Sequence, residues 1–167
     1  MDQAALYEED IYAWSQHQAQ VLRALAGAGD RLPNDLDLEH VAEEIEDLGN
    51  EQRFQVESNL GQALAHLIKV VALPQDQAVR HWTKEANAFL KNASRRYRPS
   101  MRRSIEPGKI WEWARQDAVG DLEFDGHAVP YLPTEPPFAI EELVDKAADA
   151  RALAARLAAL LGVLPEA

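Results

Sequence analysis

The chain has 167 residues, no cysteine and a net charge of −11. Its length suits one domain with one hydrophobic core, and the lack of cysteine excludes disulfides, thiolate metal sites and a cysteine nucleophile. The charge is uneven, since residues 1–79 carry −11, residues 80–109 carry +7 and residues 110–167 carry −7. The overall charge repels nucleic acid, so only the basic segment could attract it.

The N-terminal stretch carries acids at positions 8–10, where a secretory signal would carry bases. No apolar run approaches the ~20 residues of a membrane span. We therefore expect a soluble cytoplasmic protein without membrane association.

Two helical patterns come first in the chain. Apolar residues recur at intervals of three and four as far as Leu25, which predicts an amphipathic helix that ends at the glycines of 27–30. A second pattern runs over 37–73, with a break or a bend marked by Gly49. The sequence leaves open whether 37–73 is one bent helix or two helices in line.

The remaining chain predicts a helix over 75–98, a short helix over 109–122, a proline-rich irregular loop over 123–138 and a C-terminal helix over about 139–162. That C-terminal helix could pack within the chain or partly serve a dimer contact. Nothing alternates between apolar and polar as a strand would. The predicted fold is therefore all-α, an antiparallel bundle of about five to seven helices without a sheet, in a single domain over 1–167.

The acidic stretch 40–53 divides on a helical wheel. At about 100° per residue, Glu43, Glu46 and Asp47 point away from the apolar face, whereas Glu44 lies at its edge. If the helix continues past Gly49, a polar seam follows the apolar face through Glu44, Gln55, Asn59, Gln62, His66 and Lys69. Each buried group left without a partner would cost roughly 1–3 kcal/mol. The seam is therefore either a hydrogen-bonded network that holds the helices in register or the wall of a polar pocket.

In the pocket interpretation, His66 is a metal ligand or a general base, with Glu44 beside it. Trp14 and His17, one turn apart on the first helix, could join it across the bundle. His66 and Glu44 are the candidate metal ligands. The chain lacks the Glu-x-x-His motif of di-metal bundles, so the sequence does not identify a metal. No cofactor is predicted.

A basic patch surrounds Tyr97 and consists of Arg95, Arg96, Arg98, Arg102 and Arg103. Proteins that bind single-stranded nucleic acid combine cations that contact the backbone with aromatic rings on which bases stack, and this patch has both kinds of side chain. Alternatively, these cations complement the end of a helix or pair with the acidic helix near 39–51.

Four stretches together resemble the bacterial "domain of unknown function 29" family over about residues 6–145: "YEEDIYAW" at 7–14, "LDLEHVAEEIEDLGNEQR" at 36–53, "LAHLIKV" at 64–70, and Trp82. The resemblance implies an all-helical, cytoplasmic bacterial protein and supplies no activity or catalytic residues. This chain departs from the family in "LPTEPPF" at 132–138, which lacks the family's cysteine, and in a longer helix after Asp145.

The sequence holds no Gly-rich phosphate loop, nucleophile elbow or zincin motif. We therefore favour a non-enzymatic protein-interaction or structural module, with an unknown protein partner or self-association. The alternatives are a small-molecule or metal-binding, hydrolytic pocket around Glu44, His66 and Lys69, and nucleic-acid binding through the segment 95–103.

Overall fold

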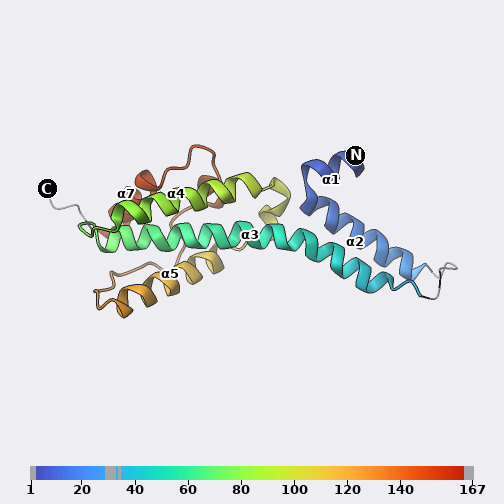
Figure 1. Cartoon of the computed structure of the whole chain (residues 1–167), viewed down its shortest axis with the longest axis horizontal. Helices are drawn as coiled ribbons and strands as arrows, with labels where there is room; N and C mark the ends of the chain where they lie inside the picture. The colour runs from blue at the N-terminus through green and yellow to red at the C-terminus, as the bar shows by residue number, and fades with distance from the viewer. Residues whose placement is uncertain (1–2, 29–32, 34, 164–167) are drawn as a thin grey trace. The chain divides into compact units, whose positions relative to one another are not determined.

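Helices dominate the protein, and the computed structural model describes residues 3–28, 33 and 35–163 (Figure 1). The elements are α1 (Gln3–Glu9), α2 (Ile11–Gly27), α3 (Leu38–Ala72), α4 (Val79–Arg96), the 3-10 helix η1 (Pro99–Arg103), α5 (Pro107–Phe124), α6 (Ile140–Leu143) and α7 (Ala150–Leu161). These described residues contain seven α-helices and no strand, which confirms the predicted all-α class. None of the described helices is long and apolar enough to cross a membrane.

The chain divides into two compact units. The first unit comprises residues 1–55 and 98–104, and the second comprises residues 56–97 and 105–167. Helix α3 contributes its first half to one unit and its second half to the other, as a single uninterrupted helix. This continuity resolves the question that Gly49 raised, while the single domain over 1–167 stays a prediction.

In the first unit, α2 and the first half of α3 form an antiparallel hairpin with small residues at its centre. Ala19 and Ala42 are fully buried. A Cβ added to Gly49 would lie 1.9 Å from Ser15 Oγ and 3.3 Å from Tyr12 Cα. Gly49 therefore allows a close approach of the two helices, and it does not break α3.

Helix α2 begins at Asp10, whose carboxylate accepts a hydrogen bond from the backbone N–H of Ala13 at 2.9 Å. That cap separates α1 from α2, although their residues had predicted one helix. Ser100 of η1 donates to the same Asp10 oxygen at 2.9 Å, and the Tyr12 hydroxyl donates to Ser104 Oγ at 2.7 Å. These bonds attach η1 to the start of α2.

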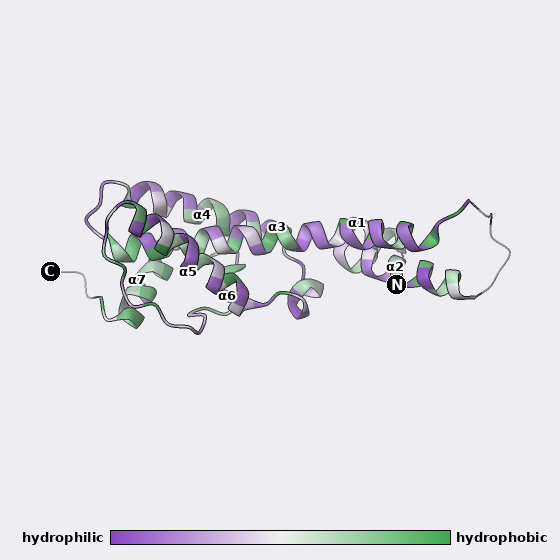
Figure 2. Cartoon of the chain, turned by 90° about the horizontal axis from the view of Figure 1, so that it is seen from below, coloured by the Kyte–Doolittle hydropathy of each residue, from purple (hydrophilic) through white to green (hydrophobic). Residues whose placement is uncertain are grey.

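In the second unit, the second half of α3 is the central element and is buried on most sides. Its fully buried apolar side chains include Leu60, Leu67 and Ile68. Helix α5 supplies Trp111, which is fully buried and donates its indole N–H to the Pro133 carbonyl at 2.9 Å. That bond anchors the proline-rich loop, whose Leu132 and Phe138 are also buried. Figure 2 shows the resulting mixture of hydrophobic and hydrophilic residues along each helix.

The single C-terminal helix expected over 139–162 is wrong, because the structure has the short α6 and the separate α7 there. The segment between them turns on two aspartates. Asp145 accepts from the backbone N–H of Ala147, and Asp149 accepts from those of Arg151 and Ala152. Such side-chain bonds compete with helical ones, and Asp149 becomes the N-cap of α7.

Candidate functional site

The first half of the predicted polar seam is not on a buried face. Glu44 and Gln55 are both exposed, so the placement of Glu44 beside a buried seam is wrong. On the helical wheel, the apolar face of this helix, which we expected to face the core, is the one that carries the large residues Val41 and Leu48. Instead α3 packs through small residues such as Ala42 and Gly49, about a quarter of a turn away. Gln55 donates to Glu51 within the same helix at 2.7 Å.

The second half of the seam lies in the packed part of α3. Asn59, Gln62 and His66 are half-buried, and Lys69 is buried. Lys69 Nζ donates to Asp121 Oδ2 on α5 at 2.7 Å, where the lysine side chain is 11% exposed and the aspartate side chain 55%. This pair links α3 to α5.

Glu85, Asp117 and His81 lie near enough for their charges to act on His66, but among the described residues they form no group that could hold a metal ion. The His66 ring stacks on Phe89 of α4, with centroids 5.8 Å apart and planes at 11°. Burial lowers the pKa of His66, and the nearby Lys69 charge lowers it further. Nδ1 is buried and has no hydrogen-bond partner among the described residues. We conclude that the ring is neutral at pH 7.

The other residues proposed for the pocket belong elsewhere. Glu44, Trp14 and His17 are part of the first unit, whereas His66 and Lys69 are part of the second. Trp14 packs edge-to-face on Tyr7 of α1, with centroids 4.8 Å apart, and His17 is exposed. Across the described residues, no group of three or more histidines, aspartates and glutamates could hold a metal ion.

The predicted basic patch is divided between the units. Arg95 and Arg96 end α4 in the second unit, whereas Arg98, Arg102 and Arg103 lie in or beside η1 in the first. Arg98 Nε donates to the carbonyl of Glu9 at 2.7 Å, and Arg95 donates to Asn92 Oδ1 at 2.5 Å. Arg98 thus holds the end of α1, which is a structural role.

Sequence reasoning missed an exposed apolar face on the α2–α3 hairpin. Val21, Val41 and Leu48 are 46%, 39% and 47% exposed, and Leu25 and Ile45 are half-buried. We call these five residues the apolar hairpin face. The sequence shows the spacing of Val41 and Leu48, but large apolar residues at helical spacing predict a buried face, so the pattern alone does not reveal their exposure.

Helix geometry places the five residues on one side of the hairpin. Viewed down the axis of α2 or α3, the exposed aliphatic residues are rotated by about a quarter to two fifths of a turn from the residues that pack between the two helices. The direction of this rotation is the same on both helices. Ser15 meets Gly49 and Arg23 bonds Glu46 at 2.6 Å, so the helices run antiparallel. When two helices are antiparallel, the same direction of rotation on each helix leads to the same side of the pair. Along the hairpin, Val21 lies at the level of the α3 segment between Val41 and Leu48.

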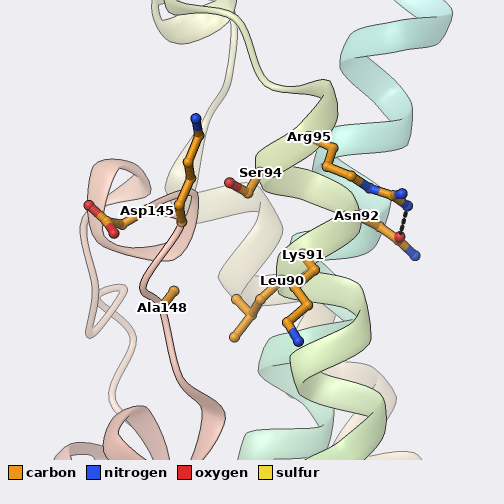
Figure 3. Close-up of a pocket in the computed structure, with 8 residues that line it drawn as sticks. Leu90, Lys91, Asn92, Ser94, Arg95, Asp145 and Ala148 are labelled. Carbon is orange, nitrogen blue, oxygen red and sulfur yellow. Dashed lines mark hydrogen bonds between the residues drawn. The ribbon is translucent and has the colours of Figure 1, made fainter.

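The second unit carries hollows along α4, one opposite Asp145 and Ala148 and another opposite Asp149 and Arg151. One has a volume of about 430 Å³, and Figure 3 shows Lys91 and Ser94 of α4 across from Asp145 and Ala148. The other has a volume of about 810 Å³ and shares Lys91 with the first. Its cations are Arg80, Lys84, Lys91 and Arg151, and we call these four residues the cationic groove.

The described helices, with no strand among them, define an all-α protein. Residues 6–148 match the family model described as a domain of unknown function, DUF29. The chain therefore belongs to the DUF29 family, which confirms the resemblance carried by its motifs.

A crystal structure of an alpha-helical protein of unknown function from Rhodospirillum rubrum is similar to this chain over nearly its whole length. The two share 33% sequence identity and superpose with a TM-score of 0.82, over 90% of this chain and 96% of the other. The comparison with curated proteins gives no match. The similarity supports the all-helical fold and assigns no activity.

Proposed function

We propose that the protein is a non-enzymatic interaction module whose first unit binds the same unit of a second copy through the apolar hairpin face. The observation that carries this proposal is the exposure of Val21, Val41 and Leu48 on one side of a two-helix hairpin. The proposed association needs no cofactor or metal.

The driving force is the removal of aliphatic surface from water. Burying a valine or leucine side chain fully is worth about 1.5–3 kcal/mol relative to exposing it. A two-helix hairpin covers only one stripe on each helix. Two hairpins that pack face to face cover the second stripe and make a four-helix bundle, the common closed form of such helices.

A twofold pair suits this face because the same patch serves both partners. The edge of the apolar hairpin face on α3 is acidic, because Asp37, Glu44 and Glu51 are all exposed there. The opposite edge, on α2, has the small exposed residues Ala24 and Ala28. An arrangement with α3 beside the partner's α2 keeps the acidic edges apart. Since each chain carries a net charge of −11, added salt should strengthen the association by screening repulsion.

Sedimentation of the full chain over a range of concentrations tests the proposal. We expect a dimer for the natural sequence and a monomer for Leu48→Glu and Val41→Glu, which place a charge in the contact. The matched control is Leu160→Glu, because Leu160 is 63% exposed on α7 and lies outside the apolar hairpin face. A natural chain that stays monomeric up to about 100 μM, or a control that dissociates equally, would overturn the proposal.

A further inference from the structure

The cationic groove stands out because its charges have no ion-pair partner among the described residues. The side chains of Arg80, Lys84, Lys91 and Arg151 form no ion pair with any residue that the structure describes. They lie on a chain whose net charge is −11. Four unpaired cations around one hollow therefore make a local positive potential that a small anion would sense.

The positions of these cations follow from the helical repeat of α4. Arg80, Lys84 and Lys91 are spaced by four and seven residues, so all three lie on one stripe along the helix, spread over about 16 Å. Arg151 stands across from them, on the first turn of α7. The two helices are fixed to each other here, since the backbone N–H of Ala150 donates to Asn87 Oδ1 at 2.9 Å.

The positive charge of the cationic groove comes from side chains and not from free backbone N–H groups at the start of α7. The first N–H groups of α7 are already taken, by Asn87 for Ala150 and by Asp149 for Arg151 and Ala152. Asp149 is the one acid among the described lining residues, and those two bonds engage its carboxylate. The Asn87 oxygen accepts from Ala150, so the amide nitrogen is the end that can donate to a ligand.

The geometry points to a site for a small polyphosphate anion, in which the cationic groove binds a chain of two or three phosphates. A volume of about 810 Å³ falls within the range of small-molecule sites. Arginine grips phosphate oxygens with two parallel hydrogen bonds, and lysine adds a compact charge. One phosphate is too short to meet cations spread along about three turns of helix, whereas linked phosphates can reach several of them.

A nucleic-acid strand fits these observations less well. No aromatic side chain is among the described residues that line the hollow, so bases would have no surface on which to stack. A long polyanion would also extend over the acidic remainder of the protein. Near physiological salt a small anion senses mainly the charges within about one Debye length, roughly 8–10 Å. The described residues that line the hollow include four cations and one acid.

Titration calorimetry of the full chain at low ionic strength tests the site, with tripolyphosphate, ATP and a single-stranded oligonucleotide as probes. We expect tripolyphosphate and ATP to bind. The double variant Lys84→Gln/Arg151→Gln should weaken both about tenfold or more, because it removes two charge-assisted contacts. Equal affinities would support recognition of the phosphates alone, and tighter binding of ATP would support a nucleoside triphosphate.

The matched control is Arg103→Gln/Lys109→Gln, which changes the net charge equally at exposed positions outside the groove. The control should bind as the natural chain does, and circular dichroism should show that both variants keep the fold. The proposal is overturned if neither phosphate compound binds, if the control loses as much affinity, or if only the oligonucleotide binds. Salt separates this site from self-association, since it weakens anion binding and strengthens the apolar contact.

Discussion

The two halves of α3 show how the same helix serves two different kinds of packing. In the first unit, α3 meets α2 through Ala42 and Gly49 and leaves Val41 and Leu48 exposed. In the second unit, α3 is enclosed by α4 and α5 and buries Leu60 and its neighbours completely. The number of helices around α3 decides which side chains are buried, because a hairpin covers one stripe and a bundle covers several.

The largest expected effect sharpens this contrast between the units. Trp111→Ala should lower the free energy of unfolding by about 3–5 kcal/mol, since it removes a fully buried ring from the second unit. Leu48→Ala, in the first unit, should change the stability of the monomer by less than about 0.5 kcal/mol. Urea denaturation at low protein concentration measures both. Similar losses for the two variants would show that Leu48 is part of a core.

Gly49→Ala tests the close contact within the hairpin. The added methyl group would collide with Ser15 Oγ, so we expect a loss of about 1–3 kcal/mol, although alanine is the better helix former. Thermal unfolding measures the change. Gly108→Ala is the control, because nothing lies near its added Cβ, and Ser15→Ala should partly relieve the Gly49 variant. A Gly49 variant as stable as the natural chain would contradict the close packing.

The Lys69–Asp121 pair gives a smaller and asymmetric effect. Asp121→Asn should destabilise the second unit by about 1–2 kcal/mol, since it leaves the buried ammonium group without its counter-ion. Lys69→Met should be close to neutral, because it removes the buried charge and keeps the apolar stem. Denaturant midpoints at pH 7 distinguish the two variants. Equal losses would mean that the ion pair itself supplies the stability.

The smallest effect contrasts two histidines whose pKa values move in opposite directions. Burial lowers the pKa of His66 from its ordinary value near 6.5, whereas the bond to Asp37 raises the pKa of His40. The His66 contribution to stability is complete above pH 6.5 and is lost as the pH falls from there through the lowered pKa. The exposed His40 has the reverse dependence, complete below pH 6.5 and lost as the pH rises through its raised pKa.

Proton NMR titration of the two imidazole rings measures these directions. His66→Gln should flatten the fall of stability below pH 6.5, by a small amount because the ring is only half-buried and water screens its charge. His40→Gln is the matched control and should leave that fall intact. A raised pKa for His66 would mean that the attraction of Glu85 and Asp117 outweighs the effect of burial.

Local patterns predicted much of the fold and little of the functional surfaces. The intervals of three and four predicted the major helices, although α5 spans Pro107–Phe124 and is longer than the predicted 109–122. The break before Asp149 was missed, although an aspartate ahead of an alanine-rich run is a known capping signal. The wheel placed His66 and Lys69 in the packed part of α3 but misplaced Glu44. It weighted large apolar residues and ignored the small ones that let helices approach.

The sequence by itself determined the all-α class, the absence of cysteine chemistry, the uneven charge and the family, because these depend on composition and on local spacing. Only the tertiary structure decided that Val41 is exposed while Ala42 is buried, that Lys69 pairs with Asp121, and that Arg151 faces the cations of α4. Each of these depends on which helix lies opposite. That choice results from packing between residues far apart in the chain, which no local periodicity records.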